Sequence, residues 1–208
     1  MFEFRLAQQT DARALYQISV LTGNLGRDAS HLYQDPNMMG HIYSVPYLKH
    51  SPELCFVVER KDEIMGFAVG TSDTCAFEQL LESEWWPKLR QTYPKPEQAK
   101  RSIWTADEKR RSMIHDPQLV PAVLSDAFPA HLHMNLHPKA QGMGLGSNLL
   151  RRWSRKAAEM GVEKVHVGVN RQNQLAVDFW KKHNFKQLDS ELSLPRTRTI
   201  WLGRSITW

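Results

Sequence analysis

Cysteine is scarce in this chain of 208 residues, and long apolar runs are absent. Only Cys55 and Cys75 occur, which excludes a disulfide scaffold and any zinc site made of cysteines alone. No stretch approaches the ~18–20 apolar residues that a membrane-spanning helix needs, so we expect no membrane partner. The first residues, MFEFRLAQQT, lack a basic segment followed by an apolar run. We therefore expect no secretory signal and a reducing, cytoplasmic location.

Acidic residues are fewer than basic ones, 22 against 27, which gives a net charge of +5. The basic residues gather in segments 86–114 and 151–156. This balance favours an anionic cofactor or an acidic partner, and it equally describes a solvated basic surface. Charge and aromatic content alone would allow a nucleic-acid-binding protein, but none of the known nucleic-acid-binding motifs is present. A nucleic acid is therefore the partner we expect least.

Hydrophobic periodicity predicts a mixed α/β sheet within one domain, residues 1–208. A helix should follow Thr10-Asp11, and glycines and core spacing predict two late helices, at 144–160 and 173–183. Residues 73–127 are rich in tryptophan, proline and charge, and we expect them to form a helical insertion between the third and fourth strands. The expected strands are 2–6, 54–60, 63–71, 131–137, 162–169, 185–188 and 199–202.

A glycine-bearing loop between a strand and a helix is the strongest local signal. Backbone N–H groups at a helix start are unpaired, and glycine allows both close approach and positive φ, so such a loop can hold a pyrophosphate. A tight turn that serves only packing is the alternative. The spacing differs from the dinucleotide fingerprint, and the Gly-Lys-Ser/Thr of a P-loop is missing. The loop residues are Gln141, Gly142, Met143, Gly144, Leu145 and Gly146.

The pattern Gln-x-x-Gly-x-Gly, formed by Gln141, Gly144 and Gly146, resembles the coenzyme A loop of the Gcn5-related N-acetyltransferase (GNAT) family. Residues 167–185 resemble the next element of that family. Segments 51–59, 66–74, 86–93, 128–129 and 202–205 further resemble the acetyltransferase-like C-terminal domain of eukaryotic O-GlcNAcase. The resemblance implies a mixed central sheet flanked by helices and binding of acetyl-CoA without a metal. We do not extend it to a glycosidase activity or to a histone substrate.

The resemblance also implies which residues bind the coenzyme. Backbone groups of Met134, Asn135, Leu136 and His137 would pair with the pantetheine, and one N–H would polarise the thioester carbonyl. Residues 141–146 would hold the pyrophosphate, and Asn173 would contact the pantetheine arm. Trp180 occupies the position at which the family often has a tyrosine that protonates the leaving thiolate. Indole cannot supply that proton, so we expect a slower reaction or a domain that binds acyl-CoA without turnover.

A base is needed because the attacking amine must be neutral. Asp73, at the end of the third strand, is the first candidate, and a capping role in a turn is its alternative. Glu59 could act through water, and His133 shares a strand face with Asn135 and His137. Three alternating histidines, His131, His133 and His137, suggest a metal, but one strand face rarely supplies a complete site. We expect no metal.

These features predict an acetyl-CoA-dependent N-acetyltransferase in which an amine attacks the thioester directly. A catalytically silent acyl-CoA-binding or interaction domain is the alternative. The acceptor is a small-molecule or protein amine whose identity the sequence leaves open. A homodimer is possible, as is common in the family.

Overall fold

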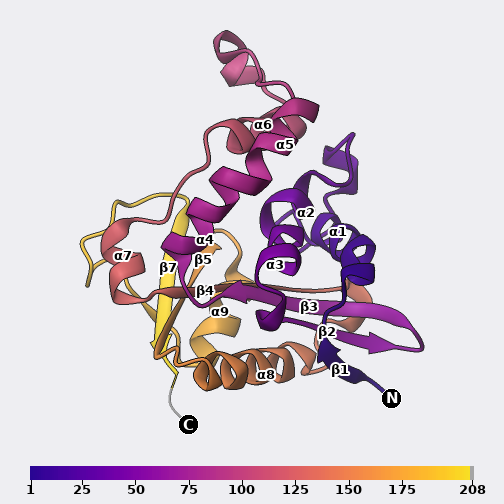
Figure 1. The fold of residues 1–208 in the computed structure, drawn as a ribbon, viewed down its shortest axis with the longest axis vertical. Helices are drawn as coiled ribbons and strands as arrows, with labels where there is room; N and C mark the ends of the chain where they lie inside the picture. Colours follow the sequence, from indigo (N-terminus) through magenta and orange to yellow (C-terminus); the bar gives the residue numbers. More distant parts are fainter. Residues whose placement is uncertain (207–208) are drawn as a thin grey trace.

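A computed structural model describes residues 1–206, which form a seven-stranded sheet of order β1-β2-β3-β4-β5-β7-β6 (Figure 1). The β4–β5 pair is parallel, and every other pair is antiparallel. The expected mixed sheet is confirmed, although β6 is shorter and β7 longer than predicted. The strands are β1 Glu3–Leu6, β2 Cys55–Arg60, β3 Glu63–Thr71, β4 Ala130–Leu136, β5 Lys164–Asn170, β6 Lys186–Gln187 and β7 Thr199–Ser205.

Helices cover both faces of the sheet. In Figure 1, α1 (Ala12–Leu21), α2 (Met38–Tyr43) and α3 (Val45–His50) lie on one side, and α8 (Leu145–Glu159) lies on the other. The apolar face of α9 (Gln174–Lys182) packs into the same core as α8. Short 3-10 segments connect these elements at Gln9–Asp11, Ser30–Leu32, Pro52–Leu54, Gln98–Ile103 and Pro138–Ala140.

The alternation of side chains along β2 separates two hydrophobic cores. Cys55 and Val57 face the core shared with α1, α3 and the insertion, whereas Phe56 and Val58 face the core under α8. Both sets are buried, which explains why the strand reads as a continuous apolar run without visible alternation. Trp153 of α8 is fully buried in the second core.

The turn between β2 and β3 consists of Lys61 and Asp62, as predicted. Both residues have positive φ, 51° and 61°. Two left-handed residues match the twist of a two-residue hairpin, even though neither is glycine. The hairpin places the end of β3, and the insertion that follows it, beside β4.

The insertion between β3 and β4 is helical, as expected. It contains α4 (Thr74–Leu80), a π-helical segment (Leu81–Trp85), α5 (Trp86–Thr92), α6 (Ala106–His115) and α7 (Ala122–Ala127). Figure 1 shows α5 and α6 projecting beyond the end of the sheet. Two tryptophans of the insertion, Trp86 and Trp104, are buried, and Trp85 donates its Nε1–H to the carbonyl of His41.

Strands β4 and β5 pair only at their beginnings, where Ala130 lies opposite Val165 and His131 opposite His166. Beyond this point, residues Leu132–Leu136 of β4 have no ladder partner on the β5 side. The opening leaves backbone groups of β4 free to bind another chain or a ligand. Glycine-loop residues follow directly after this open edge.

Candidate active site

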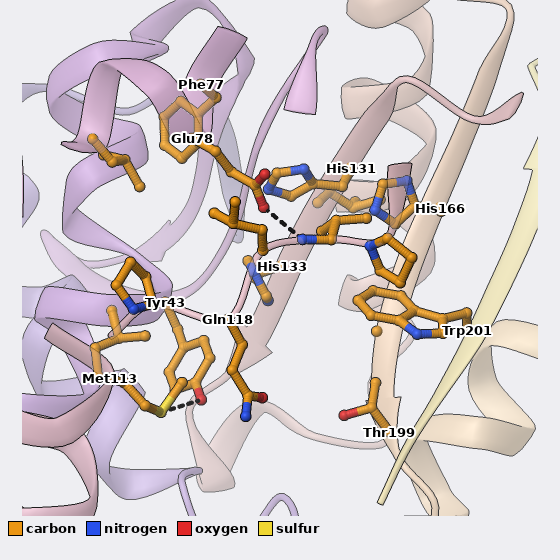
Figure 2. Close-up of a pocket in the computed structure, with 18 of the residues that line it drawn as sticks. Tyr43, Phe77, Glu78, Met113, Gln118, His131, His133, His166, Thr199 and Trp201 are labelled. Carbon is orange, nitrogen blue, oxygen red and sulfur yellow. Dashed lines mark hydrogen bonds between the residues drawn. The ribbon is translucent and has the colours of Figure 1, made fainter. Parts of the chain in front are cut away.

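A cavity of about 650 Å³ lies beside the opening of the sheet. Its floor comes from Leu132 and His133 of β4, and one wall comes from His166 of β5 and Trp201 of β7. Helix α4 and segment 117–121 of the insertion form the opposite side, and Tyr43 of α2 closes one end (Figure 2). The insertion therefore covers the open edge of β4.

His131 is held in one tautomer by its neighbours. The Thr74 hydroxyl donates to the Pro129 carbonyl at 2.6 Å, because a carbonyl can only accept. Thr74 Oγ1, which has a single hydrogen, must then accept from His131 Nδ1 at 2.8 Å. The opposite nitrogen, Nε2, carries no proton and accepts from the Tyr47 hydroxyl at 2.6 Å. Burial lowers the pKa of His131 well below its usual range, so the ring is neutral.

His133 and His166 line the same cavity and are also neutral at physiological pH. Burial, with a smaller contribution from His166, lowers the pKa of His133 to about 4. Burial also lowers the pKa of His166 to about 4 against the opposing hydrogen bond to Phe128. His166 Nδ1 donates to the Phe128 carbonyl at 2.7 Å, and its Nε2 has no protein partner within residues 1–206. These rings offer acceptor nitrogens and no charge.

Within residues 1–206, Glu78 of α4 supplies the one carboxylate that lines the cavity. It is half-buried, and its Oε1 accepts from the Val120 N–H at 2.8 Å. Burial raises the pKa of Glu78 against this hydrogen bond. Figure 2 shows its side chain directed to the part of the cavity where the histidines lie. Sequence reasoning missed Glu78, although an acidic residue next to Phe77, on the helix that follows the third strand, was an available signal.

Two of the three predicted bases lie elsewhere. Asp73 is exposed and is the N-cap of α4, where its Oδ1 accepts from the Ala76 N–H at 3.0 Å. This is the capping role that the turn-like sequence allowed. Glu59 accepts from Arg5 at 2.7 Å, and Arg5 also binds Asp11. Neither Asp73 nor Glu59 lines the cavity, whereas His133 does.

The glycine loop has the geometry that a pyrophosphate site needs. Gly142 and Gly144 have φ of 76° and 74°, and a Cβ at either position would meet no atom within 4 Å. The glycines are thus required by backbone conformation, and the surface above them is open. Gly144 is the N-cap of α8, a helix of 15 residues whose first N–H groups are free to bind an anion. The loop fits a coenzyme A pyrophosphate.

Side chains around the loop hold the neighbouring chain in place. Gln141 donates to the carbonyls of Leu136 and Gly26, and Asn135 donates to the Thr22 hydroxyl at 2.6 Å. Both side chains thus have structural partners, and their contact with a coenzyme stays a prediction. Asn173 is the N-cap of α9 and accepts from the Ala176 N–H.

The structure also places the other predicted coenzyme residues. The N–H of His137 donates to the Met65 carbonyl at 2.9 Å, so it is not free for the pantetheine. Met134 and Gly146 meet near Phe179, which lies 3.2 Å from where a Cβ on Gly146 would be. Trp180 is 6% exposed and belongs to the core under α8 and α9. Met143 and Leu145 occupy the loop and the first turn of α8.

Within residues 1–206, His, Cys, Asp and Glu side chains nowhere come together in a group of three that could hold a metal ion. The helices of this part of the chain are all too short or too polar to cross a bilayer.

A mixed sheet that opens beside its fourth strand, with a glycine loop at the end of that strand, is the architecture of acetyltransferases. A family model described as the acetyltransferase (GNAT) family matches residues 27–185, and the chain belongs to this family. The crystal structure of a protein named SsHAT is 30% identical, with a TM-score of 0.90 and coverage of 100% of this chain and 99% of that one.

Curated relatives agree with the more specific resemblance. Protein O-GlcNAcase of Rattus norvegicus is 23% identical over 171 residues, which are 82% of this chain and 18% of that protein. The chain therefore spans less than a fifth of the length of this relative. The putative acetyltransferase yncA of Salmonella typhimurium, solved with its cofactor acetyl-CoA, is 14% identical with a TM-score of 0.54 and coverage of 99% and 94%. At that identity the likeness shows the fold alone.

Proposed function

We propose that this chain is an acetyl-CoA-dependent N-acetyltransferase that moves an acetyl group to an amine by direct attack. One observation carries the proposal. The open edge of β4 leads from the glycine loop to a cavity that contains a carboxylate with a raised pKa. The coenzyme thioester requires a site for its phosphates, and the amine requires a group that accepts its proton. The free edge of β4 has one of these at each end.

The coenzyme would supply an activated acetyl thioester. Residues 141–146 would hold its pyrophosphate through backbone N–H groups at the start of α8. The open edge at Met134, Asn135 and Leu136 would align the extended arm, and Asn173 would face it from the start of α9. This set is the one that the family resemblance predicts, without the N–H of His137.

Proton handling would fall to Glu78, with His133 as the neighbouring acceptor. A carboxylate with a raised pKa is a stronger base than a solvated one, and it can also hold an ammonium group before deprotonation. His133 stays neutral, so it can accept a hydrogen bond without repelling a cation. The half-buried position of Glu78 keeps bulk water away from the proton that it accepts.

The leaving thiolate would depart without a tyrosine donor. Trp180 stands at that position and is buried in the core. A thiol has a pKa of ~8.5, so its thiolate is an acceptable leaving group at neutral pH. We expect turnover that is slow for the family.

A catalytically silent acyl-CoA-binding domain is the second candidate. The buried Trp180 favours it because no general acid stands at that position. Both candidates require coenzyme binding, and only turnover separates them.

A thermal melt with acetyl-CoA tests the shared requirement, with ADP and NAD as controls. At ~100 times the dissociation constant, binding should add ~2.7 kcal/mol of stability. In Gly144→Glu the shift should vanish, because charge and side chain occupy the pyrophosphate site. Gly161→Glu is the matched control: Gly161 has φ of +83°, an equally open Cβ direction, and lies just past the other end of α8. Equal shifts in both variants would reject the site, and release of free thiol with an amine would reject the silent domain.

A further inference from the structure

We propose that the cavity takes a monocationic primary amine carried on an aromatic or other flat apolar body, with its ammonium group bound at Glu78. This inference rests on the proposed function and adds the class of acceptor.

The charge inside the cavity suits one cation. Among the described residues that line the cavity, Glu78 is the single carboxylate, and one of its oxygens already accepts from Val120. The other oxygen has no hydrogen-bond partner among residues 1–206, so it is available to an ammonium group. Arg198, the one positively charged lining residue in that part of the chain, is exposed. A polyamine or an aminoglycoside brings several ammonium groups, and this cavity could pair only one of them.

The walls of the cavity are flat and aromatic. Tyr47 and Phe77 stack with ring centroids 4.4 Å apart, and the Tyr43 ring lies 5.6 Å from that of His133. On the opposite side the Trp201 indole lies against Gly168, where a Cβ would come within 2.8 Å of the ring. The glycine therefore lets the indole lie flat on β5. Such surfaces bind an apolar ring by burial and stabilise a cation over their faces.

The single carboxylate also disfavours a basic peptide. A lysine-rich peptide brings several ammonium groups, whereas the lining of the cavity, within residues 1–206, offers one carboxylate. A small amine with one charge needs only that carboxylate. The volume, about 650 Å³, is in the range of pockets that bury small ligands.

The ammonium group of the acceptor gives one proton to the Glu78 carboxylate and becomes a neutral amine. Its nitrogen forms a bond to the acetyl carbonyl carbon, and the carbon–sulfur bond breaks with its electron pair leaving on the sulfur. The nitrogen then loses a second proton, which the thiolate takes up, and Glu78 releases its proton to solvent. The products are the N-acetyl amine, a thiol and one proton.

The test compares amines at a fixed, saturating acetyl-CoA concentration, with thiol release as the readout. We expect 2-phenylethylamine and tryptamine to give kcat/KM at least tenfold above spermidine, kanamycin and a lysine-rich peptide. Calorimetry of 2-phenylethylamine with protein saturated with coenzyme A provides a second readout that does not require turnover. Higher kcat/KM for spermidine or the basic peptide would overturn the proposal.

Glu78→Gln is the decisive variant because it removes the charge and keeps the shape. We expect a loss of at least tenfold in affinity for 2-phenylethylamine, with the acetyl-CoA melt shift unchanged. Glu82→Gln, an exposed insertion residue that pairs with Arg90, is the matched control and should behave as wild type. Unchanged amine affinity in Glu78→Gln would refute the acceptor class. A melt shift with acetyl-CoA, but without acetylation of any amine, would also refute the acceptor class and leave coenzyme binding intact. No melt shift with acetyl-CoA would refute the proposed function itself.

Discussion

The Tyr47 hydroxyl on α3 donates a buried hydrogen bond of 2.6 Å to Nε2 of His131 on β4. The bond ties the N-terminal helical layer to the strand that carries the candidate active site. Because Thr74 fixes the other nitrogen of the ring as a donor, Nε2 has no proton of its own and depends on Tyr47. The contact therefore fixes the orientation of His131, whose ring is kept neutral by burial.

Replacing this phenol should destabilise the fold. In Tyr47→Phe, Nε2 of His131 stays buried and loses its donor, which costs about 1–3 kcal/mol. Urea unfolding followed by fluorescence measures the change in the free energy of unfolding. The double variant Tyr47→Phe/His131→Phe removes both polar partners, and its cost should be clearly less than the sum of the single variants. Additive costs would show that the two side chains are not coupled.

Acid should weaken the fold through the buried histidines. Their pKa values are lowered in the folded state, to about 4 for His133 and His166, against a usual value of 6.5. Between these values the unfolded chain binds more protons than the folded one, so stability falls as pH drops from about 6.5 to about 4. Each ring contributes up to about 1.4 kcal/mol per pH unit. Unfolding free energies at pH 7, 6 and 5 measure this slope.

The variant that isolates one ring is His166→Asn, because asparagine keeps a donor for the Phe128 carbonyl and does not titrate. Its slope between pH 6 and pH 5 should be smaller than that of wild type by up to about 1.4 kcal/mol per pH unit. His31→Asn, at an exposed position, should leave the slope unchanged. Identical slopes in all three proteins would contradict a buried neutral His166.

The sequence predicted most of the sheet because each strand carries its own signal. The hairpin at Lys61-Asp62 and the end of α8 before Gly161 both depend on neighbours in the chain. The order of elements then follows from connection rules. The prediction from sequence was least accurate at β6, where only two residues pair, and at β7, which extends to Ser205.

The sequence predicted only the part of the candidate site that is formed by one continuous segment of the chain. The glycine loop lies within one strand–loop–helix unit, so its positive φ angles follow from the sequence. The cavity instead joins α2, α4, β4, β5 and β7, and no spacing rule indicates that Glu78 and Trp201 line one space. Gly70 illustrates the same limit: a Cβ there would lie 2.3 Å from the His131 carbonyl, a contact set by strand pairing alone.

Asp107 should hold the insertion against the N-terminal helical layer. This buried carboxylate accepts from the N–H groups of Gln34 and Asp35, both at 3.0 Å. In Asp107→Asn an amide group faces one of these donors, and we expect a loss of about 1–3 kcal/mol. Hydrogen exchange at the amides of Gln34 and Asp35 should accelerate, whereas Asp126→Asn, at an exposed position, should change neither quantity. Unaltered exchange in Asp107→Asn would show that these bonds do not hold the insertion.

Asp73 and Glu78 lie five residues apart, and the structure predicts opposite effects for them. Asp73 caps α4 from an exposed position, so Asp73→Ala should cost about 1 kcal/mol of stability and Asp73→Asn much less, since asparagine also caps. A loss of 1 kcal/mol lowers the Tm by about 2–4 °C in a chain of this size. Acetyl transfer by folded Asp73→Ala should stay near the wild-type rate because the side chain does not line the cavity. Thiol release, assayed well below the Tm measured for each variant, separates stability from chemistry. If Asp73→Ala remains folded and loses turnover while Glu78→Gln keeps it, the base is Asp73 and the cavity carboxylate has another role.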